Sequence, residues 1–228
     1  MFLTEEMKKY EDLSSDIVRG VNIINTSQKY YFIQLQPNEA EDTVKKELIL
    51  PYINDDLWIT SDLHLNHKNR NSSEFVNQMV SEINSKVSIK DAIMFCGDMG
   101  KKDDPNQKNF IKSFLDRLNP SIKILLLGNH DILPISDWYD MGFTFVTDMI
   151  KTKVGNDIIK FSHYPLPISD CDLNVHGHIH EDIEYWNLPW QKHINVYIHN
   201  HEDKIYKLKD YKKFYVEGKY KGKTVFKD

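Results

Sequence analysis

From Asp56 onward the sequence repeats one pattern: a short apolar run, a polar cluster rich in Asp, Asn and His, and an amphipathic stretch. Three of the apolar runs are Leu57–Thr60, Ala92–Cys96 and Ile122–Leu127, and each has the length of a buried strand. After Ser73, apolar residues recur at three- and four-residue spacing, which is typical of a helix. The alternation of such strands and helices predicts an α/β fold.

The later part of the chain has further strand-like runs with fewer helices between them. These runs are Asp157–Ser162, Asp172–Val175 and Ile194–Ile198. The strands predicted in the earlier part of the chain alternate with helices, and these later strands do not, so we expect the later strands to form a second sheet.

Composition narrows the class of protein. The 228 residues are 40% hydrophobic and 28% charged, which excludes a disordered polyelectrolyte. A formal net charge of -5 excludes a general polyanion binder, so nucleic acid is not a favoured partner. Cys96 and Cys171 are too few for a disulfide framework, and we see neither a signal peptide nor a run of roughly 20 apolar residues. We therefore expect a cytoplasmic protein without a membrane partner.

The two ends of the chain differ from its middle. Residues 1–52 carry no recognisable chemistry and are interpreted as an N-terminal extension of unknown role, so that residues 53–228 form the main domain. Residues 203–228 hold nine lysines against four acids, with aromatic residues between them. This C-terminal segment is either a nucleic-acid contact strip or a solvated edge hairpin with one apolar face, and we favour the hairpin.

The polar clusters at the ends of the runs consist of metal-type donors. Loops that leave the carboxyl ends of strands converge on one crevice, so these donors should meet. Asp62 and His64 are two residues apart, as are His178 and His180, and in an extended segment such pairs share a face. The full donor set is Asp62, His64, Asp98, Asn129, His163, His178 and His180. Seven donors exceed what one ion takes, and two ions bridged by a carboxylate account for them.

The ordered series Asp-x-His, Gly-Asp, Gly-Asn-His-Asp, His and Gly-His-x-His, between Asp56 and Ile198, resembles the calcineurin-like metallophosphoesterase superfamily. Residues 61–69 look most like its small stand-alone bacterial and phage members, described as predicted phosphoesterases. The resemblance implies an α/β four-layer α-β-β-α sandwich with two divalent transition-metal ions in a groove at its top. Manganese is the expected metal, with iron, zinc and nickel as alternatives.

Carried over position by position, the resemblance assigns a role to each donor. One ion would be held by Asp62, His64, Asp98 and His180, and the other by Asp98, Asn129, His163 and His178. Asp98 would be the bridge. His130 would be the acid that protonates the leaving oxygen, and Asp131 would orient or charge its imidazole. Many members have a second Asp three places after the bridging one, where this chain has Lys101.

The function implied is that of a dinuclear-metal-dependent phosphoesterase, a phosphatase or phosphodiesterase that hydrolyses a phosphate mono- or diester by attack of a metal-bound hydroxide. His67 and Arg70 follow the first metal loop and are candidates for substrate contact. One alternative is a nuclease or nucleotide phosphodiesterase that uses the same site. The other is a non-catalytic scaffold on the same fold. The substrate, a phosphate ester such as a nucleotide, is not specified further by the sequence, and neither is the oligomeric state.

Overall fold

The computed structural model describes residues 22–23, 33–34, 48–67, 73–180 and 192–217. The chain divides into two compact units, Met1–Pro37 and Asn38–Asp228. In the first unit, β1 (Asn22–Ile23) pairs antiparallel with β2 (Ile33–Gln34). The domain boundary expected after residue 52 stays a prediction, although Ile49 and Ile53, on either side of it, lie in one hydrophobic core.

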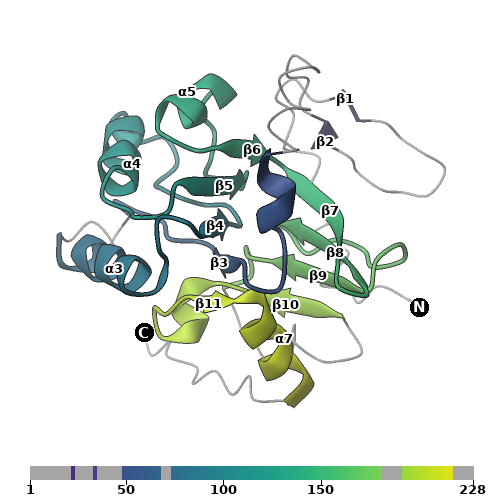
Figure 1. Ribbon diagram of the computed structural model, residues 1–228. Coiled ribbons are helices and arrows are strands. Elements are labelled where there is room, and N and C mark those ends of the chain that lie inside the picture. Colours follow the sequence, from purple (N-terminus) through teal and green to yellow (C-terminus); the bar gives the residue numbers. More distant parts are fainter. Residues whose placement is uncertain (1–21, 24–32, 35–47, 68–72, 181–191, 218–228) are drawn as a thin grey trace. The chain divides into compact units, whose positions relative to one another are not determined.

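A five-stranded sheet with the order β11-β3-β4-β5-β6 forms one half of the second unit. Its strands are β3 (Trp58–Thr60), β4 (Ala92–Phe95), β5 (Ile122–Leu126), β6 (Phe145–Thr147) and β11 (Tyr206–Lys207). β3 to β6 are parallel, and β11 pairs antiparallel with β3 at the edge. Helices α3 (Ser73–Lys86), α4 (Gln107–Leu115) and α5 (Ile135–Asp140) lie on the same side of this sheet (Figure 1).

A four-stranded sheet with the order β10-β9-β8-β7 forms the other half. Its strands are β7 (Met149–Val154), β8 (Asp157–Ser162), β9 (Leu173–His176) and β10 (His193–Asn195). β7 and β8 are antiparallel, while β8, β9 and β10 are parallel. Two 3-10 helices, Leu50–Tyr52 and Ile198–His201, complete the connections together with helix α7 (Leu208–Glu217).

Alternating side chains of the five-stranded sheet enter two separate cores. Met94 and Ile124 point to one side, where they meet Phe161 and Val175 of the other sheet. The intervening residues, such as Ile93, belong to a second core with the helices. The strands of the five-stranded sheet are apolar on both faces because one face packs on the other sheet and the second face packs on helices.

The sequence predicted the α/β class and the two sheets correctly, and the predicted strands are present. Helix α5 and strands β6 and β7 were not anticipated. The run Ile194–Ile198 is a strand only as far as Asn195, after which the chain turns into a 3-10 helix. None of the helices in the described ranges has the length and apolar character that a membrane span requires.

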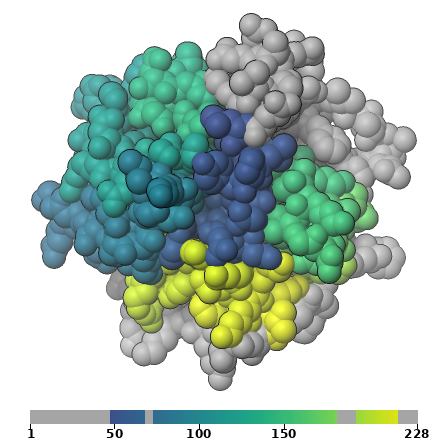
Figure 2. Space-filling view, viewed as in Figure 1, coloured from purple at the N-terminus to yellow at the C-terminus, as the bar shows by residue number. Residues whose placement is uncertain are grey.

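The hairpin expected in the C-terminal segment is wrong for residues 206–217, which form β11 and α7. Leu208, Tyr211 and Tyr215 follow helical spacing and pack on the core between the sheets. Lys207 and Lys209 both form ion pairs with Asp56. In Figure 2 the yellow surface of this segment lies directly against the blue surface of residues near 50. Residues 218–228 lie outside the described ranges.

Candidate metal centre

The structure brings all seven predicted donors together at the carboxyl ends of the strands. Asp62 and His64 follow β3, Asp98 follows β4, and Asn129 follows β5. The remaining three come from the other sheet, because His163 follows β8 and both His178 and His180 follow β9. The donor set is therefore contributed by both sheets.

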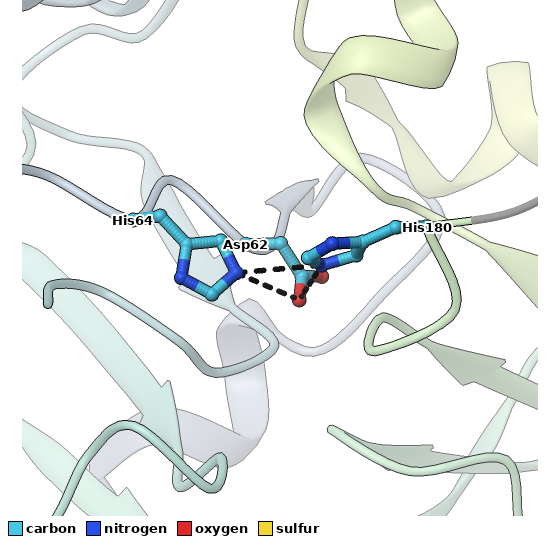
Figure 3. A group of neighbouring side chains, drawn as sticks. All are labelled: Asp62, His64 and His180. Carbon is cyan, nitrogen blue, oxygen red and sulfur yellow. Dashed lines mark hydrogen bonds and ion pairs between the residues drawn. The ribbon is translucent and has the colours of Figure 1, made fainter. Parts of the chain in front are cut away.

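The first donor group consists of Asp62, His64 and His180, which point toward one another (Figure 3). Nε2 of His180 lies 3.0 Å from Oδ1 of Asp62, and Nε2 of His64 lies 3.8 Å from the same oxygen. The two Nε2 atoms are 3.3 Å apart. Asp62 is fully buried, and Tyr197 stacks on the ring of His180 with centroids 4.2 Å apart.

The second donor group consists of Asp98, Asn129, His163 and His178. Nε2 of His163 lies 3.1 Å from Oδ1 of Asn129 and 3.1 Å from Nδ1 of His178. Nδ1 of His178 is also 3.1 Å from Oδ1 of Asn129. The other ring nitrogen of His163, Nδ1, lies 2.8 Å from the carbonyl oxygen of Cys96 and donates to it, which fixes the orientation of the ring.

Asp98 lies between the two groups. Its Oδ2 is 3.6 Å from Nε2 of His64 in the first group and 3.6 Å from Nε2 of His163 in the second. Its Oδ1 accepts a hydrogen bond from the backbone N–H of His130 at 2.8 Å. One carboxylate oxygen is thus equidistant from both groups, as a bridging ligand requires.

Five of the separations between donor atoms fit the geometry of metal coordination. Two ligand atoms about 2.1 Å from one ion, at the angles of tetrahedral or octahedral coordination, lie roughly 3.0–3.4 Å apart. The pairs among Asn129, His163 and His178 are all 3.1 Å apart, and those around His180 are 3.0 and 3.3 Å apart. The pairs of Asp98 with His64 and His163, at 3.6 Å, and that of Asp62 with His64, at 3.8 Å, are wider. Mixed imidazole, amide and carboxylate donors are also the set that divalent transition metals take.

Burial and neighbouring charges shift the pKa values of the donors. Burial, together with the charges of Asp62 and Asp131, raises the pKa of Asp98, although His163 opposes the rise. Burial also lowers the pKa of His178 to about 3, so its imidazole is neutral and has a lone pair to offer. Burial opposes protonation of His163 too, but Asp98 and Asp62 outweigh it and raise its pKa. A divalent cation would stabilise the charged form of these carboxylates.

The backbone at the site is strained. Asp62, His64, Asp98 and His178 have φ values of 58°, 44°, 54° and 67°, in the left-handed region that side-chain-bearing residues rarely adopt. The sequence predicted that Asp62 and His64 share one face of an extended segment, and this prediction is wrong. The two side chains approach each other because the chain turns after β3.

Two glycines leave room for these carboxylates. A Cβ on Gly128 would lie 2.3 Å from Oδ1 of Asp98, and a Cβ on Gly177 would lie 2.3 Å from Oδ2 of Asp62. No real Cβ atom lies so close to an oxygen atom, so a residue larger than glycine would clash before Asn129 and before His178.

Comparison with known proteins agrees with this geometry. Residues 56–214 match the calcineurin-like phosphoesterase family. The chain belongs to this family. The match spans the described site completely, so the fold predicted from the resemblance is confirmed. The metal-ligand assignments of individual residues remain a proposal.

The solved structures that this phosphoesterase family member matches share little sequence with it. A protein of unknown function from Aquifex aeolicus is 19% identical, with a TM-score of 0.55 over 69% of this chain and 98% of that one. A nuclease from Pseudomonas putida is 16% identical over 55% and 62%, with a TM-score of 0.41. An archaeal phosphodiesterase is 18% identical over 61% and 81%, also with a TM-score of 0.41. A search of curated proteins found no match.

His130 lies beside the first donor group, with its ring at a centroid distance of 4.6 Å from that of His64. The structure differs from our expectation for Asp131. Its carboxylate accepts hydrogen bonds from the backbone N–H groups of Asp98, Met99 and Gly128, at 2.7, 2.9 and 2.9 Å. Asp131 therefore ties together the loops after β4 and β5. The backbone N–H of Lys102 donates to Nδ1 of His130 at 3.2 Å instead.

The expected substrate contacts are only partly described. The ring of His67 lies 5.9 Å from that of His64 and 6.1 Å from that of His130, so it borders the first donor group. Arg70 lies outside the described residues. At the place of the second Asp found in many relatives, Lys101 is exposed, and the nearby Asp104 accepts a hydrogen bond from Asn66.

Sequence reasoning missed two residues that shape the site. Gln107 is buried at the start of α4 and donates from Nε2 to the carbonyl oxygen of His130 at 3.1 Å. Tyr164 packs its ring against His163 and His178. Tyr164 directly follows the candidate donor His163, so the sequence could have drawn attention to it, whereas nothing in the sequence connects Gln107 with His130.

Proposed function

We propose that this protein is a dinuclear-metal-dependent phosphoesterase that hydrolyses a phosphate mono- or diester. The observation that carries the proposal is the position of Asp98, whose Oδ2 is 3.6 Å from an imidazole nitrogen of each donor group. Two donor groups that share a carboxylate, with His130 beside them, provide both the metal binding and the proton transfer that ester hydrolysis needs.

The first ion would be held by Asp62, His64, Asp98 and His180, and the second by Asp98, Asn129, His163 and His178. When bound, the ions supply positive charge that polarises the phosphoryl group and makes water more acidic. Nδ1 of His130 lies 3.2 Å from the backbone nitrogen of Lys102. We assign the imidazolium form of His130 to the leaving oxygen, because it gives up one ring proton and becomes a neutral imidazole. Gln107 and Asp98 hold the backbone of His130 in place.

A nuclease that acts on a polymer is less well supported. Three of the described lysines in the C-terminal segment already face carboxylates, because Lys207 and Lys209 pair with Asp56, and Lys212 pairs with Asp55 and Asp157. The non-catalytic alternative is disfavoured by the completeness of the donor set and by the strained backbone that supports it, since strain of this kind is typical of functional sites.

The test combines metal analysis with a substrate panel. Protein loaded with Mn²⁺ should contain two ions per chain and hydrolyse nitrophenyl phosphate esters, whereas chelator-treated protein should be inactive until Mn²⁺ is restored. Iron, zinc and nickel are tested in parallel, and the panel includes monoesters, diesters, cyclic nucleotides and oligonucleotides. Full activity with a single ion per chain, or no hydrolysis with any metal, would refute the proposal.

A further inference from the structure

Three of the buried polar side chains on β8 and β9 that belong to neither donor group form one cluster: Lys160, Ser162 and Asn174. Asn174 links them, because its Nδ2 donates to the carbonyl oxygen of Lys160 at 3.1 Å and lies 3.0 Å from Oγ of Ser162. A buried ammonium and a buried amide are costly unless they are fully bonded, so their bonding partners indicate what they hold in place.

All of these side chains bind the segment that follows His163, residues 164–170, which we call the Tyr164 loop. Lys160 donates to the carbonyl oxygen of Pro167 at 3.0 Å and pairs with Asp170. Asn174 accepts the N–H of Leu166 at 2.7 Å. Ser162 donates to the carbonyl oxygen of Tyr164 at 2.6 Å. The Tyr164 loop is therefore fixed at its beginning, middle and end by side chains from the sheet.

The loop places one aromatic ring at the metal centre. The ring centroid of Tyr164 is 4.9 Å from that of His163 and 4.7 Å from that of His178, and the residue is half-buried. Both imidazoles belong to the second donor group. Burial and the nearby carboxylate of Asp98 raise the pKa of the phenol, so the ring is neutral at physiological pH.

Tyr164 and His130 are associated with different donor groups. His130 packs on His64 of the first group, and Tyr164 packs on His163 and His178 of the second. A phosphodiester carries two ester groups, of which one leaves and one is retained. When His130 serves the leaving group, the retained group is the one available to Tyr164.

We propose that Tyr164, held by its anchored loop, stacks on a nucleoside that remains attached to phosphorus in a phosphodiester substrate. This inference rests on the proposed function and makes its substrate class more specific. Stacking of a base on an aromatic side chain is worth roughly 5- to 150-fold in binding.

The test keeps the leaving group constant and varies the retained group. Three Mn²⁺-dependent substrates are compared: nitrophenyl phosphate, methyl nitrophenyl phosphate and the nitrophenyl ester of thymidine 5′-monophosphate. Tyr164→Leu should lose roughly 10-fold more kcat/KM on the thymidine ester than on the other two, since only that ester offers a base to stack. A loss caused by looser packing of His163 and His178 is common to the three esters and cancels in this ratio. Tyr164→Phe keeps the ring and should behave like the wild type on all three.

A binding measurement without turnover accompanies the rates. Calorimetric titration of each variant with thymidine monophosphate and with inorganic phosphate should show weaker binding of the nucleotide alone in Tyr164→Leu. Thermal melting checks that the variants fold, and Tyr164→Met replaces the leucine variant if that one does not.

Two results would overturn the inference while leaving the proposed function intact: an equal or absent loss on the three esters in Tyr164→Leu, or a loss in Tyr164→Phe as large as in Tyr164→Leu, which would assign the role to the hydroxyl. If the wild type hydrolyses none of the three esters with Mn²⁺, Fe²⁺, Zn²⁺ or Ni²⁺, the proposed function fails and the inference fails with it.

Discussion

Replacing Gly128 with alanine should damage the metal centre without removing any donor. The new Cβ would lie 2.3 Å from Oδ1 and 2.7 Å from the backbone nitrogen of Asp98, whereas ordinary contact begins at 3.4 Å. The carboxylate must therefore move by about 1 Å, which is several times the roughly 0.2 Å tolerance of a metal–ligand bond. The φ of Gly128 is outside the left-handed region, so the backbone itself accepts alanine.

Because Asp98 is assigned to both ions, we expect Gly128→Ala to weaken both sites. The affinity for Mn²⁺ should fall roughly 10- to 100-fold, as when the partners of metal ligands are removed. At saturating Mn²⁺, hydrolysis of a nitrophenyl ester should still be slower by on the order of 10²-fold, which is the effect of a 1 Å misplacement in an active site. Metal content after dialysis and the Mn²⁺ dependence of the rate measure the two effects.

The control is Gly142→Ala. Gly142 has a φ of 108° and nothing within 4 Å of its would-be Cβ, so alanine there strains the backbone but does not reach the site. This variant should lose thermal stability and keep its metal and its activity. If Gly128→Ala binds two ions with wild-type affinity and turns over normally, Asp98 is not confined as we describe and the bridging role is wrong.

Three further variants test separate parts of the site and the fold. Asp98→Ala should lose both ions together in metal analysis, and retention of one ion would reassign this carboxylate. His130→Ala should keep both ions but lower the hydrolysis of alkyl esters by roughly 10²- to 10⁴-fold, with a smaller defect on nitrophenyl esters; an equal defect on both would argue against proton transfer. Burial raises the pKa of Asp148 from 3.8 to about 7 in the native state. Between pH 3.8 and about 7 this carboxyl group ionises only in the unfolded state, so the free energy of unfolding falls as pH rises through that range. Asp148→Asn should remove that loss in denaturant titrations at a series of pH values, and an unchanged pH profile would contradict the assignment.

The sequence was most informative where chemistry and strand ends coincide. The donors could be listed because each follows a short apolar run. They were expected to meet because loops that leave the carboxyl ends of strands converge on one crevice. The local geometry could not be derived in the same way. Left-handed backbone at Asp62 and Asp98 is unfavourable for such residues, and only the surrounding bonds, including those from Asp131, compensate for it.

The C-terminal segment shows a different kind of error. Its lysines dominated the interpretation, although Leu208, Tyr211 and Tyr215 already had the spacing of a helix. The lysines indicate only which side of the segment faces solvent, whereas its apolar residues decide where the segment packs. Helix α5 was missed because six residues are too few for helical periodicity to be detected.

Each donor group takes residues from both sheets, and this affects the order in which the protein can assemble. Asp62 and His180 are 118 residues apart in the chain, so the first group exists only after the two sheets have docked. An intermediate with either sheet formed alone would hold fragments of a site and bind metal weakly. Rapid-mixing experiments that follow Mn²⁺ uptake during refolding would therefore report the docking of the sheets, and the ions would act as a late cross-link that slows their separation.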